Sequence, residues 1–347
     1  IQCSIGTLFF NFHEGLESIG EMAFWACKSL ESVSIPSSVT EIGTNAFAGC
    51  ENLESIVIPA SVESIGGWAF QSCRSLTSVT LPEGITNVNE WLFYSCLALE
   101  DVYIPESVKY IGEYAFDATK AQTSFFEEAS KATEEKDRYW IVGNILISAY
   151  VAEGQTAVHI PEGVKMIAGS ALCGWDTAYA PEDTTGLSAS AITKYNITNN
   201  VTELYLPEGL ESIGNMAFFR MACIETIDLP STLLSIGSNA FYFCTELSEV
   251  TGGENLQKIS DYAFCYCTSL TQFRAPETVS HIGANVFAGC SSLKTVYLPT
   301  SFDVPTASLF DESCTALSKV YVNASVRPCI YFLLGPIQQT ISVDYYK

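Results

Sequence analysis

The stretch Leu30 to Asn52 reads LESVSIPSSVTEIGTNAFAGCEN, and the next 23 residues, Leu53 to Ser75, read LESIVIPASVESIGGWAFQSCRS. The second stretch repeats the first almost position for position. Self-similarity at a fixed period is typical of repeat architectures, in which each copy buries its apolar residues against its neighbours. The sequence therefore predicts a repeat solenoid.

The first half of the unit predicts a short strand followed by a turn. Val33 and Ile35 alternate with polar residues, so they form one face of a strand. Pro36 has no backbone N–H to extend a ladder, which predicts that a turn follows. Val39 and Ile42 then form a second brief apolar segment.

The second half of the unit predicts a special backbone position and a helical turn. Gly43 suits a residue with positive φ, and Asn89, which replaces it in one copy, is the next most tolerant residue there. Ala46, Phe47 and Cys50 have the spacing of one helical turn, so we expect the ring and the thiol to lie on the same side.

The register of the repeats is visible in the prolines and cysteines. Four prolines lie 23 residues apart, as do four cysteines: Pro36, Pro59, Pro82 and Pro105, and Cys27, Cys50, Cys73 and Cys96. After this block the phase shifts, and a second set of prolines shares a new register: Pro161, Pro207, Pro230, Pro276 and Pro299. Stacked copies in register predict continuous internal ladders of apolar side chains.

We expect residues 1–347 to form a single elongated solenoid domain. Its predicted parts are regular coils at 7–118, an insertion with a hairpin at 120–157, coils at 158–300 with a degenerate coil at 176–200, and a C-terminal coil and cap at 301–347. Within the insertion, an acidic helix-prone run, Phe126–Arg138, precedes a hairpin that turns at Gly143-Asn144. In the cap, Cys329–Leu334 and Ile341–Val343 are expected to pair as strands.

The unit IPxxVxxIGxxAFxxCxxLxxV resembles the repeat of the BspA-like leucine-rich repeat family. Similar runs cover about four fifths of the chain, and one copy reads Ile58-Pro59, Val62, Ile65-Gly66, Ala69-Phe70, Cys73 and Leu76. The resemblance implies a right-handed coil with a parallel β-sheet on the concave face, and short strands, turns and one-turn helices elsewhere. It also implies a secreted or surface-exposed binding protein, some relatives being adhesins with widely different ligands.

Composition excludes several classes of partner. The chain has 16 Lys and Arg against 39 Asp and Glu, a net charge of -23, which argues against nucleic acids and anionic membranes. No run of 18 or more apolar residues predicts a membrane span. The chain begins with Ile1, and Phe10 and Phe12 already lie in the strand phase, so we expect an upstream export signal to have been removed and the protein to be extracellular or on the cell surface.

Most of the 13 cysteines have a structural interpretation. Seven occupy one inward slot of the repeat: Cys27, Cys50, Cys73, Cys96, Cys244, Cys267 and Cys290. Trp175 and Met221 stand in the same slot, so it selects apolar volume, and we expect buried free thiols. Adjacent coils would bring thiols within reach of a disulfide, so oxidation stays open. Cys265 and Cys267 are the nearest approach to a metal pair, without a CxxC or His cluster beside them.

The sequence predicts no catalytic site and no cofactor. His13, His159 and His281 fall on coils far apart, so no two can share a site, and a Ser or Cys nucleophile would lack an activating base. No GxGxxG, P-loop or HExxH motif occurs. The many carboxylates fall mostly in turns, where a solvated face explains them.

The outward residues of the main strands form the predicted concave face, and it is here that we expect ligand contacts. The early coils present mainly Ser, Thr and Val, whereas the later ones present larger groups: Tyr103, His159, Tyr205, Asp228, Arg274, Tyr297 and Tyr321. Tyrosine provides contact area at low entropic cost. Aromatic residues also suit strands for packing reasons alone.

Three functions remain open at this stage. The first is a binding module, such as an adhesin, that holds a protein of the host or of a bacterial surface with the concave face or the 120–157 insertion. The second is a passive spacer on the cell envelope. The third is a carbohydrate-binding module that uses the tyrosines. We expect a monomer without membrane insertion.

Overall fold

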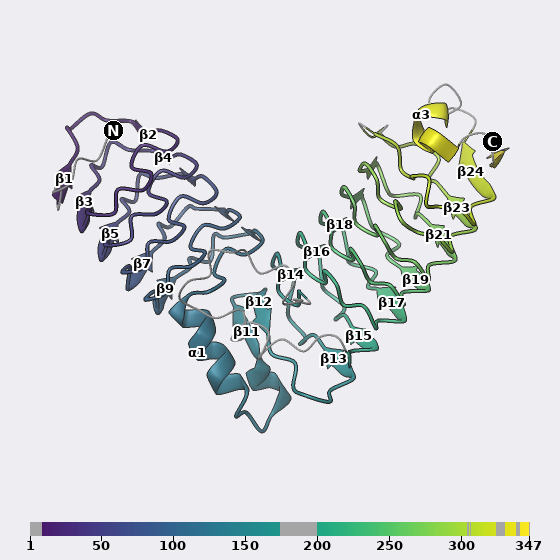
Figure 1. Cartoon of the computed structure of the whole chain (residues 1–347), viewed down its shortest axis with the longest axis horizontal. Coiled ribbons are helices and arrows are strands. Elements are labelled where there is room, and N and C mark those ends of the chain that lie inside the picture. Colours follow the sequence, from purple (N-terminus) through teal and green to yellow (C-terminus); the bar gives the residue numbers. More distant parts are fainter. Residues whose placement is uncertain are drawn as a thin grey trace. The chain divides into compact units, whose positions relative to one another are not determined.

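The computed structural model describes residues 9–173, 200–303, 305, 307–323, 330–337 and 341–346. Within them the chain forms two compact units, unit 1 up to Gly143 and unit 2 from Asn144 onward. Both units are stacks of coils in which short parallel strands recur, as Figure 1 shows for each. Trp175 and the predicted degenerate coil at 176–200 lie outside the described residues, apart from Asn200.

The main strands of unit 1 lie in chain order in one parallel sheet. They are β1 (Phe9–Asn11), β3 (Ser32–Ser34), β5 (Ser55–Val57), β7 (Ser78–Thr80) and β9 (Asp101–Tyr103). Phe10 pairs with Val33 and Val33 with Ile56, so the 23-residue period of the sequence is the register of the sheet. The second apolar segment of each repeat unit, which Val39 and Ile42 define in one copy, ends in a strand of two residues. These strands are β2 (Ser18–Ile19), β4 (Glu41–Ile42), β6 (Ser64–Ile65), β8 (Asn87–Val88) and β10 (Tyr110–Ile111).

Unit 1 ends in a helix and a strand that break the repeat. Helix α1 (Lys120–Ala129) begins after Thr119, whose side chain accepts a hydrogen bond from the backbone N–H of Gln122 at 3.2 Å. A 3-10 helix, η1 (Glu135–Arg138), and strand β11 (Tyr139–Val142) follow. The helix therefore starts before the acidic run at 126–138 that predicted it, because the N-cap precedes that run.

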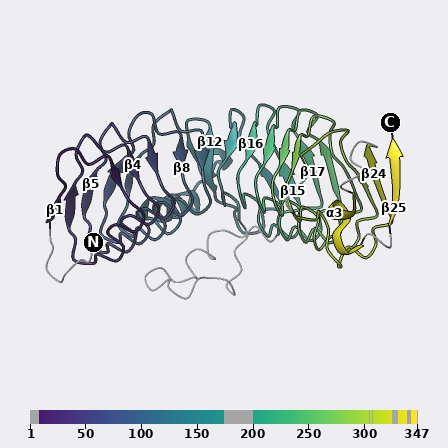
Figure 2. The same cartoon turned by 90° about the horizontal axis from the view of Figure 1, so that it is seen from above.

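Unit 2 repeats the two sets of strands. Its second set begins with the five-residue strand β12 (Ile145–Ala149) and continues with two-residue strands, in the order β14 (Met166–Ile167), β16 (Ser212–Ile213), β18 (Ser235–Ile236), β20 (Lys258–Ile259) and β22 (His281–Ile282). Its main strands form two sheets, β13 (Ala157–His159), β15 (Glu203–Tyr205), β17 (Thr226–Leu229) and β19 (Glu249–Gly252), then β21 (Gln272–Arg274), β23 (Thr295–Tyr297), β24 (Lys319–Asn323) and β25 (Ser342–Tyr346). Figure 2 shows β15 and β17 lying side by side. The predicted turn at Gly143-Asn144 separates β11 from β12.

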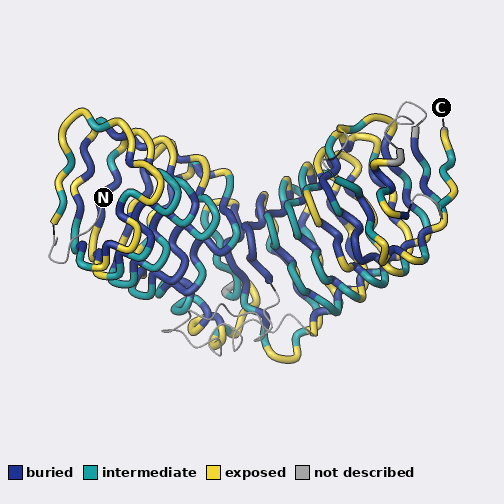
Figure 3. The backbone as a smooth tube through the Cα atoms, turned by 45° about the horizontal axis from the view of Figure 1, so that its top comes forward, coloured by how far each residue is buried: buried dark blue, intermediate teal, exposed yellow. Residues whose placement is uncertain are grey.

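A ladder of phenylalanine rings forms the core of each unit. Neighbouring rings stack at centroid distances of 5.2 to 5.7 Å in unit 1 and 5.2 to 6.2 Å in unit 2. Most are fully buried, and Figure 3 shows buried segments recurring from coil to coil. The rings are Phe24, Phe47, Phe70, Phe93 and Phe116 in unit 1, and Phe218, Phe241, Phe264, Phe287 and Phe310 in unit 2.

A second ladder explains why cysteine recurs beside the rings. The thiol of Cys73 donates to the carbonyl oxygen of Phe47 at 3.3 Å, and that of Cys267 to the carbonyl of Phe241 at 3.2 Å, each 26 residues earlier in the chain. Cysteine in this slot therefore supplies apolar volume and a hydrogen bond, whereas Met221 in the same slot supplies apolar volume alone. Burial raises the pKa of the Cys50 thiol to about 12, so it stays protonated at neutral pH.

Ten described cysteines are free, but the expectation of a free thiol is wrong for Cys27, which is disulfide-bonded. Cys27 lies in the first coil of the phenylalanine ladder, so no described coil precedes it to supply the carbonyl that its counterparts use. Its bonding partner lies outside the described residues, since every other described cysteine is free.

The physical reason predicted for the glycine after the second strand is wrong. Neither Gly43 nor Asn89 has a positive φ. A Cβ on Gly43 would lie 2.6 Å from the backbone nitrogen of Glu21, and one on Gly66 would lie 2.4 Å from that of Thr44. The close approach of the preceding coil's backbone thus favours glycine at this position, although Asn89 occupies it in one coil.

The left-handed positions lie further along the coil, where the sequence predicted one helical turn. Asn45 and Gly49 have φ of 56° and 74°, and Trp68 has φ of 58° in the next coil. The segment consists of consecutive turns, in which alternate N–H groups donate to the next coil, such as Phe47 N–H to the Ala69 carbonyl at 2.8 Å. A continuous α-helical turn would instead direct these donors along its own axis, to carbonyl groups of the same coil.

The cap differs from the predicted strand pair. Residues 330–334 form the short helix α3 (Ile330–Leu334), and β25 pairs in parallel with β24, placing Val343 beside Val320. Leu333 and Leu334 are buried, and the Leu333 carbonyl accepts a hydrogen bond from Leu309 N–H at 3.1 Å. Leu333 and Leu334 thus cover the coil of Leu309 from a short helix.

Candidate functional site

The third residue of each main strand points outward, and these residues form what we call the main-strand row. In β5 and β15 the first and third residues are exposed and the second is buried, as expected for a strand that has one face covered. The row of unit 1 is Asn11, Ser34, Val57, Thr80 and Tyr103; the row of unit 2 is His159, Tyr205, Asp228, Thr251, Arg274, Tyr297, Tyr321 and Asp344. Every residue predicted to contact a ligand belongs to one of these two rows.

At the start of the unit 2 row, two rings stack across neighbouring strands. His159 pairs with Tyr205, and their ring centroids lie 4.3 Å apart with planes 3° from parallel. The Tyr205 hydroxyl donates to a carboxylate oxygen of Glu203, and this hydrogen bond and the charge of Glu203 raise the pKa of Tyr205. Tyr205 is nevertheless 48% exposed, so the pair is ordered and accessible at once.

At the other end of the row, three residues form a continuous stack. The guanidinium carbon of Arg274 lies 4.0 Å from the centre of the Tyr297 ring, whose other neighbour, Tyr321, lies 4.4 Å away with planes 1° apart. Lys319 lies 4.8 Å from the centre of the Tyr321 ring and forms a 2.6 Å ion pair with Asp344. Cation–π and stacking contacts of this kind hold long side chains in a single arrangement.

Asp228 and Tyr103 lie apart from these two stacks. Asp228 accepts a hydrogen bond from the Thr251 hydroxyl on the paired strand at 2.7 Å. Tyr103 belongs to unit 1, is 50% exposed, and donates to Glu83 at 2.7 Å, which raises its pKa. The structure therefore brings together five of the seven predicted residues, in one pair and one trio.

Sequence analysis missed a second set of outward aromatic residues in unit 2. Phe219 stacks on Tyr242 at 5.2 Å, Phe243 stacks on Tyr266 at 4.6 Å, and Arg220 lies over Phe243 at 5.3 Å. They occupy the two positions after each buried ladder phenylalanine. The sequence indicates these outward residues in two runs, Phe218-Phe219-Arg220 and Phe241-Tyr242-Phe243. Only the first ring of each run lies in the buried ladder, so the residues after it must lie elsewhere.

The described residues contain no group of three or more His, Cys, Asp and Glu side chains that could hold a metal ion. His159 lies on β13 and His281 on β22, in different sheets of unit 2, and His13 belongs to unit 1. Among the same residues, no helix has both the length and the apolar character needed to cross a membrane.

Comparison with known proteins identifies a repeat family and no enzyme family. Solved structures with a similar fold include a leucine-rich repeat protein of Bacteroides ovatus (22% identity, 97% of this chain and 77% of that one, TM-score 0.41) and one of Eubacterium ventriosum (20% identity, 98% and 84%, TM-score 0.47). A third is a leucine rich cell surface protein of Faecalibacterium prausnitzii (23% identity, 95% and 91%, TM-score 0.36). No curated protein matches the sequence.

The family assignment rests on the sequence itself. The BspA type leucine rich repeat region (6 copies) matches residues 2–123 and 191–318, which together make up more than half of the 347 residues. The matched ranges contain the coils whose phenylalanine and cysteine ladders are described above. The chain belongs to the BspA-type leucine-rich repeat family.

Proposed function

We propose that this protein is a secreted or cell-surface binding module that holds a partner protein on the main-strand row of unit 2. An adhesive role is one form of this function. The observation that carries the proposal is the stack of Arg274, Tyr297 and Tyr321, whose members are ordered by one another and remain at the surface. No catalytic step is part of it.

The side chains of this stack are held in place before a partner binds, which favours affinity. Immobilising a side chain on association costs about 0.5–1.5 kcal/mol, and residues already stacked on a neighbour avoid much of that loss. Tyr and Arg are also the residue types that dominate binding energy in protein interfaces. The row offers both, with Asp228 and His159 as further polar groups on the same face.

The same geometry disfavours sugar binding at Tyr297. A sugar ring would stack on an open aromatic face, but one face of Tyr297 is covered by Arg274 and the other by Tyr321. Tyr205 likewise gives one face to His159. These rings present edges and hydroxyl or charged groups to a partner, which suits the mixed polar and apolar surface of a protein.

The test is capture of surface proteins from host and bacterial extracts by the immobilised protein. We expect the wild type to retain a defined protein that the double variant Tyr205→Ser with Tyr297→Ser does not retain. The matched control is Ser32→Ala with Ser55→Ala on main strands of unit 1, which should capture the same protein as the wild type.

Two results would contradict the proposal. If the tyrosine variant captures the same protein as the wild type, the row of unit 2 is not the binding surface. If neither the wild type nor the tyrosine variant retains a protein from the host and bacterial extracts, a passive spacer on the cell envelope becomes the better interpretation. Melting temperatures of all variants should agree, since the replaced side chains lie outside the core.

A further inference from the structure

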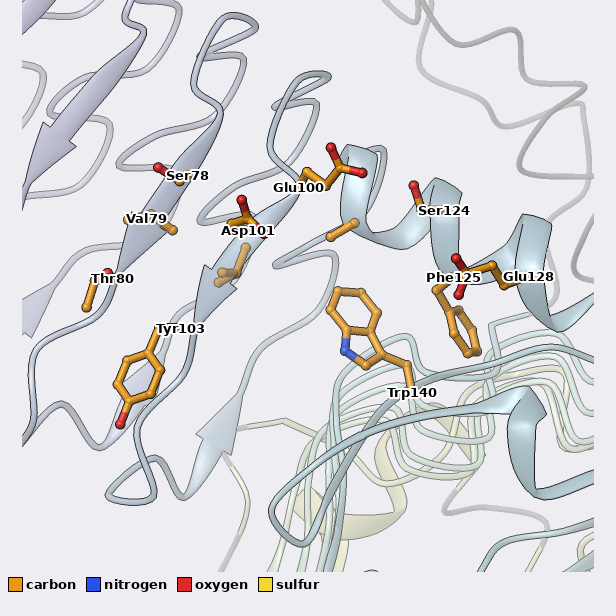
Figure 4. Close-up of a pocket in the computed structure, with 12 residues that line it drawn as sticks. Ser78, Val79, Thr80, Glu100, Asp101, Tyr103, Ser124, Phe125, Glu128 and Trp140 are labelled. Carbon is orange, nitrogen blue, oxygen red and sulfur yellow. The ribbon is translucent and has the colours of Figure 1, made fainter.

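Unit 1 contains a pocket of about 570 Å³ where its regular coils end. Its floor is made by side chains of β7 and β9, and its walls by α1 and β11 (Figure 4). The residues that matter for its chemistry are Glu100, Asp101, Tyr103, Phe125, Glu128 and Trp140. The volume falls within the usual range for ligand pockets, about 300–1,000 Å³.

The charge of the pocket is entirely negative. Glu100 lies directly before β9, Asp101 begins it and Glu128 belongs to α1, and among the described residues no Lys, Arg or His lines the pocket. All three side chains are exposed, and none has an ion pair with a described Lys or Arg. Three carboxylates around one opening lower the potential there and attract a cation.

Two aromatic rings form the apolar part of the wall. Trp140 and Phe125 lie with ring centroids 6.1 Å apart, and Trp140 also packs 5.8 Å from the ladder ring of Phe116, which fixes its place. Both rings are only half-buried, so part of each faces the pocket. Figure 4 shows Trp140 between the strand that carries Asp101 and the end of α1 that carries Glu128.

Tyr103 bounds the pocket on the side away from α1 (Figure 4). Its hydroxyl donates to Glu83 at 2.7 Å, and this hydrogen bond and the charge of Glu83 raise the pKa of Tyr103, so the phenol stays neutral and its donor is already used. The pocket therefore offers acceptors and ring faces, with no charged donor for an anionic ligand.

We propose that this pocket takes the side chain of an arginine from a partner protein. A guanidinium is planar, pairs with carboxylates through its fork of N–H groups, and stacks on aromatic rings, so it uses both kinds of wall at once. The chain's net charge of -23 favours partners with basic surfaces. The proposal rests on the protein-binding function above for the source of the arginine, but the pocket and its chemistry lie in unit 1 alone.

The probe is the tripeptide acetyl-Gly-Arg-Gly-amide, compared with the same peptide containing citrulline, which keeps the shape of arginine and removes its charge. Binding is followed by NMR through the indole N–H resonance of Trp140, which the Trp140→Phe variant assigns. We expect a saturable shift of this resonance with the arginine peptide, and an affinity at least tenfold lower for the citrulline peptide.

The triple variant Glu100→Gln, Asp101→Asn, Glu128→Gln should lower the affinity for the arginine peptide at least tenfold. Its matched control, Glu41→Gln, Glu54→Gln, Glu63→Gln, removes three exposed carboxylates of the same unit outside the pocket and should bind as the wild type does. Raising the salt concentration should weaken binding to the wild type.

Equal binding of the two peptides, unchanged affinity in the pocket variant, or the absence of a saturable shift at Trp140 would each overturn the proposal. Because the probe is a tripeptide and every readout belongs to unit 1, these results do not depend on whether the row of unit 2 holds a partner. Failure of this proposal and failure of the proposed function are therefore distinguishable.

Discussion

The two units share one construction and differ in the side chains that their main-strand rows present. Both have parallel main strands, a stacked phenylalanine ladder and cysteine thiols that donate to phenylalanine carbonyls. The main-strand row of unit 1 presents Ser34, Val57 and Thr80, whereas that of unit 2 presents stacked Tyr, His and Arg side chains.

This difference separates the residues that make the coil from those free to acquire a function. A ladder position contacts the coils on both sides, so its side chain is restricted in volume and shape. A side chain in the main-strand row contacts neighbouring side chains of the row and is otherwise open to solvent. The position therefore accepts Ser, Val, Thr or Tyr without a change of the backbone. Binding specificity on a rigid array is accordingly carried by such outward positions.

The largest effect should come from the ladder, and it should be the same in both units. Phe70 and Phe241 are fully buried and stack on rings in the preceding and following coils. Replacing either with alanine should lower the free energy of unfolding by about 3–5 kcal/mol, because the coils cannot close the cavity. Chemical denaturation measures this, with exposed Glu63→Ala as the near-neutral control. A large loss in only one unit would show that the ladders are not equivalent.

A smaller, pH-dependent effect should distinguish the end of unit 1, where Asp117 occupies the position that Tyr242 has in unit 2. Asp117 accepts a hydrogen bond from Gln122 at 3.0 Å, and burial raises the pKa of its carboxyl from 3.8 to about 7. The folded state therefore holds the proton more tightly than the unfolded state, and stability is lost as pH rises from about 4 to about 7.

The Asp117→Asn variant should lack this loss. At about 1.4 kcal/mol per pKa unit, reduced because the side chain is only half-buried, the difference should reach about 2 kcal/mol by pH 7. Denaturation curves at several pH values measure it, with Glu63→Gln as the control that should follow the wild type. Parallel pH profiles for Asp117→Asn and the wild type would show that the carboxyl is solvated.

Replacing tyrosines in the row should change binding and leave stability alone. Once a partner is in hand, Tyr205→Ser and Tyr297→Ser should each weaken binding by more than about 1 kcal/mol, the scale of interface hot spots. Ser32→Ala and Ser55→Ala should leave the affinity unchanged. Calorimetric titration measures both. If the tyrosine variants bind normally and deletion of residues 120–157 abolishes binding, the insertion carries the site instead.

The smallest effect should be the native reactivity of the thiols. Burial raises the pKa of Cys265 to about 12 and that of Cys314 to about 11, so neither is a thiolate at neutral pH. Of the described free cysteines, an alkylating reagent should modify at most the half-buried Cys223 in the native protein, whereas most of the 13 cysteines of the chain should react after denaturation without reductant. Mass spectrometry counts the modified sites. Disulfides between successive coils would contradict buried free thiols in the ladder.

The sequence alone determined the solenoid, its register and its buried ladders. A period of 23 residues, visible in the prolines and cysteines, is the pairing offset of the main strands, and the residues predicted inward, such as Phe47 and Cys50, are fully buried. These features follow from sequence because each depends on a pattern within one coil and on its repetition. The outward row, including Tyr205 and Arg274, follows from the same alternation.

Only the tertiary structure decided how residues on different coils meet. The close backbone approach at Gly43, the thiol hydrogen bonds of the cysteine ladder, the sandwich around Tyr297 and the pocket between β9, α1 and Trp140 all depend on distances between segments about 20 to 40 residues apart. A repeat pattern states which face a side chain occupies. It does not state the spacing and tilt of neighbouring coils, and stacking, hydrogen bonding and cavity volume change over fractions of an ångström in those quantities.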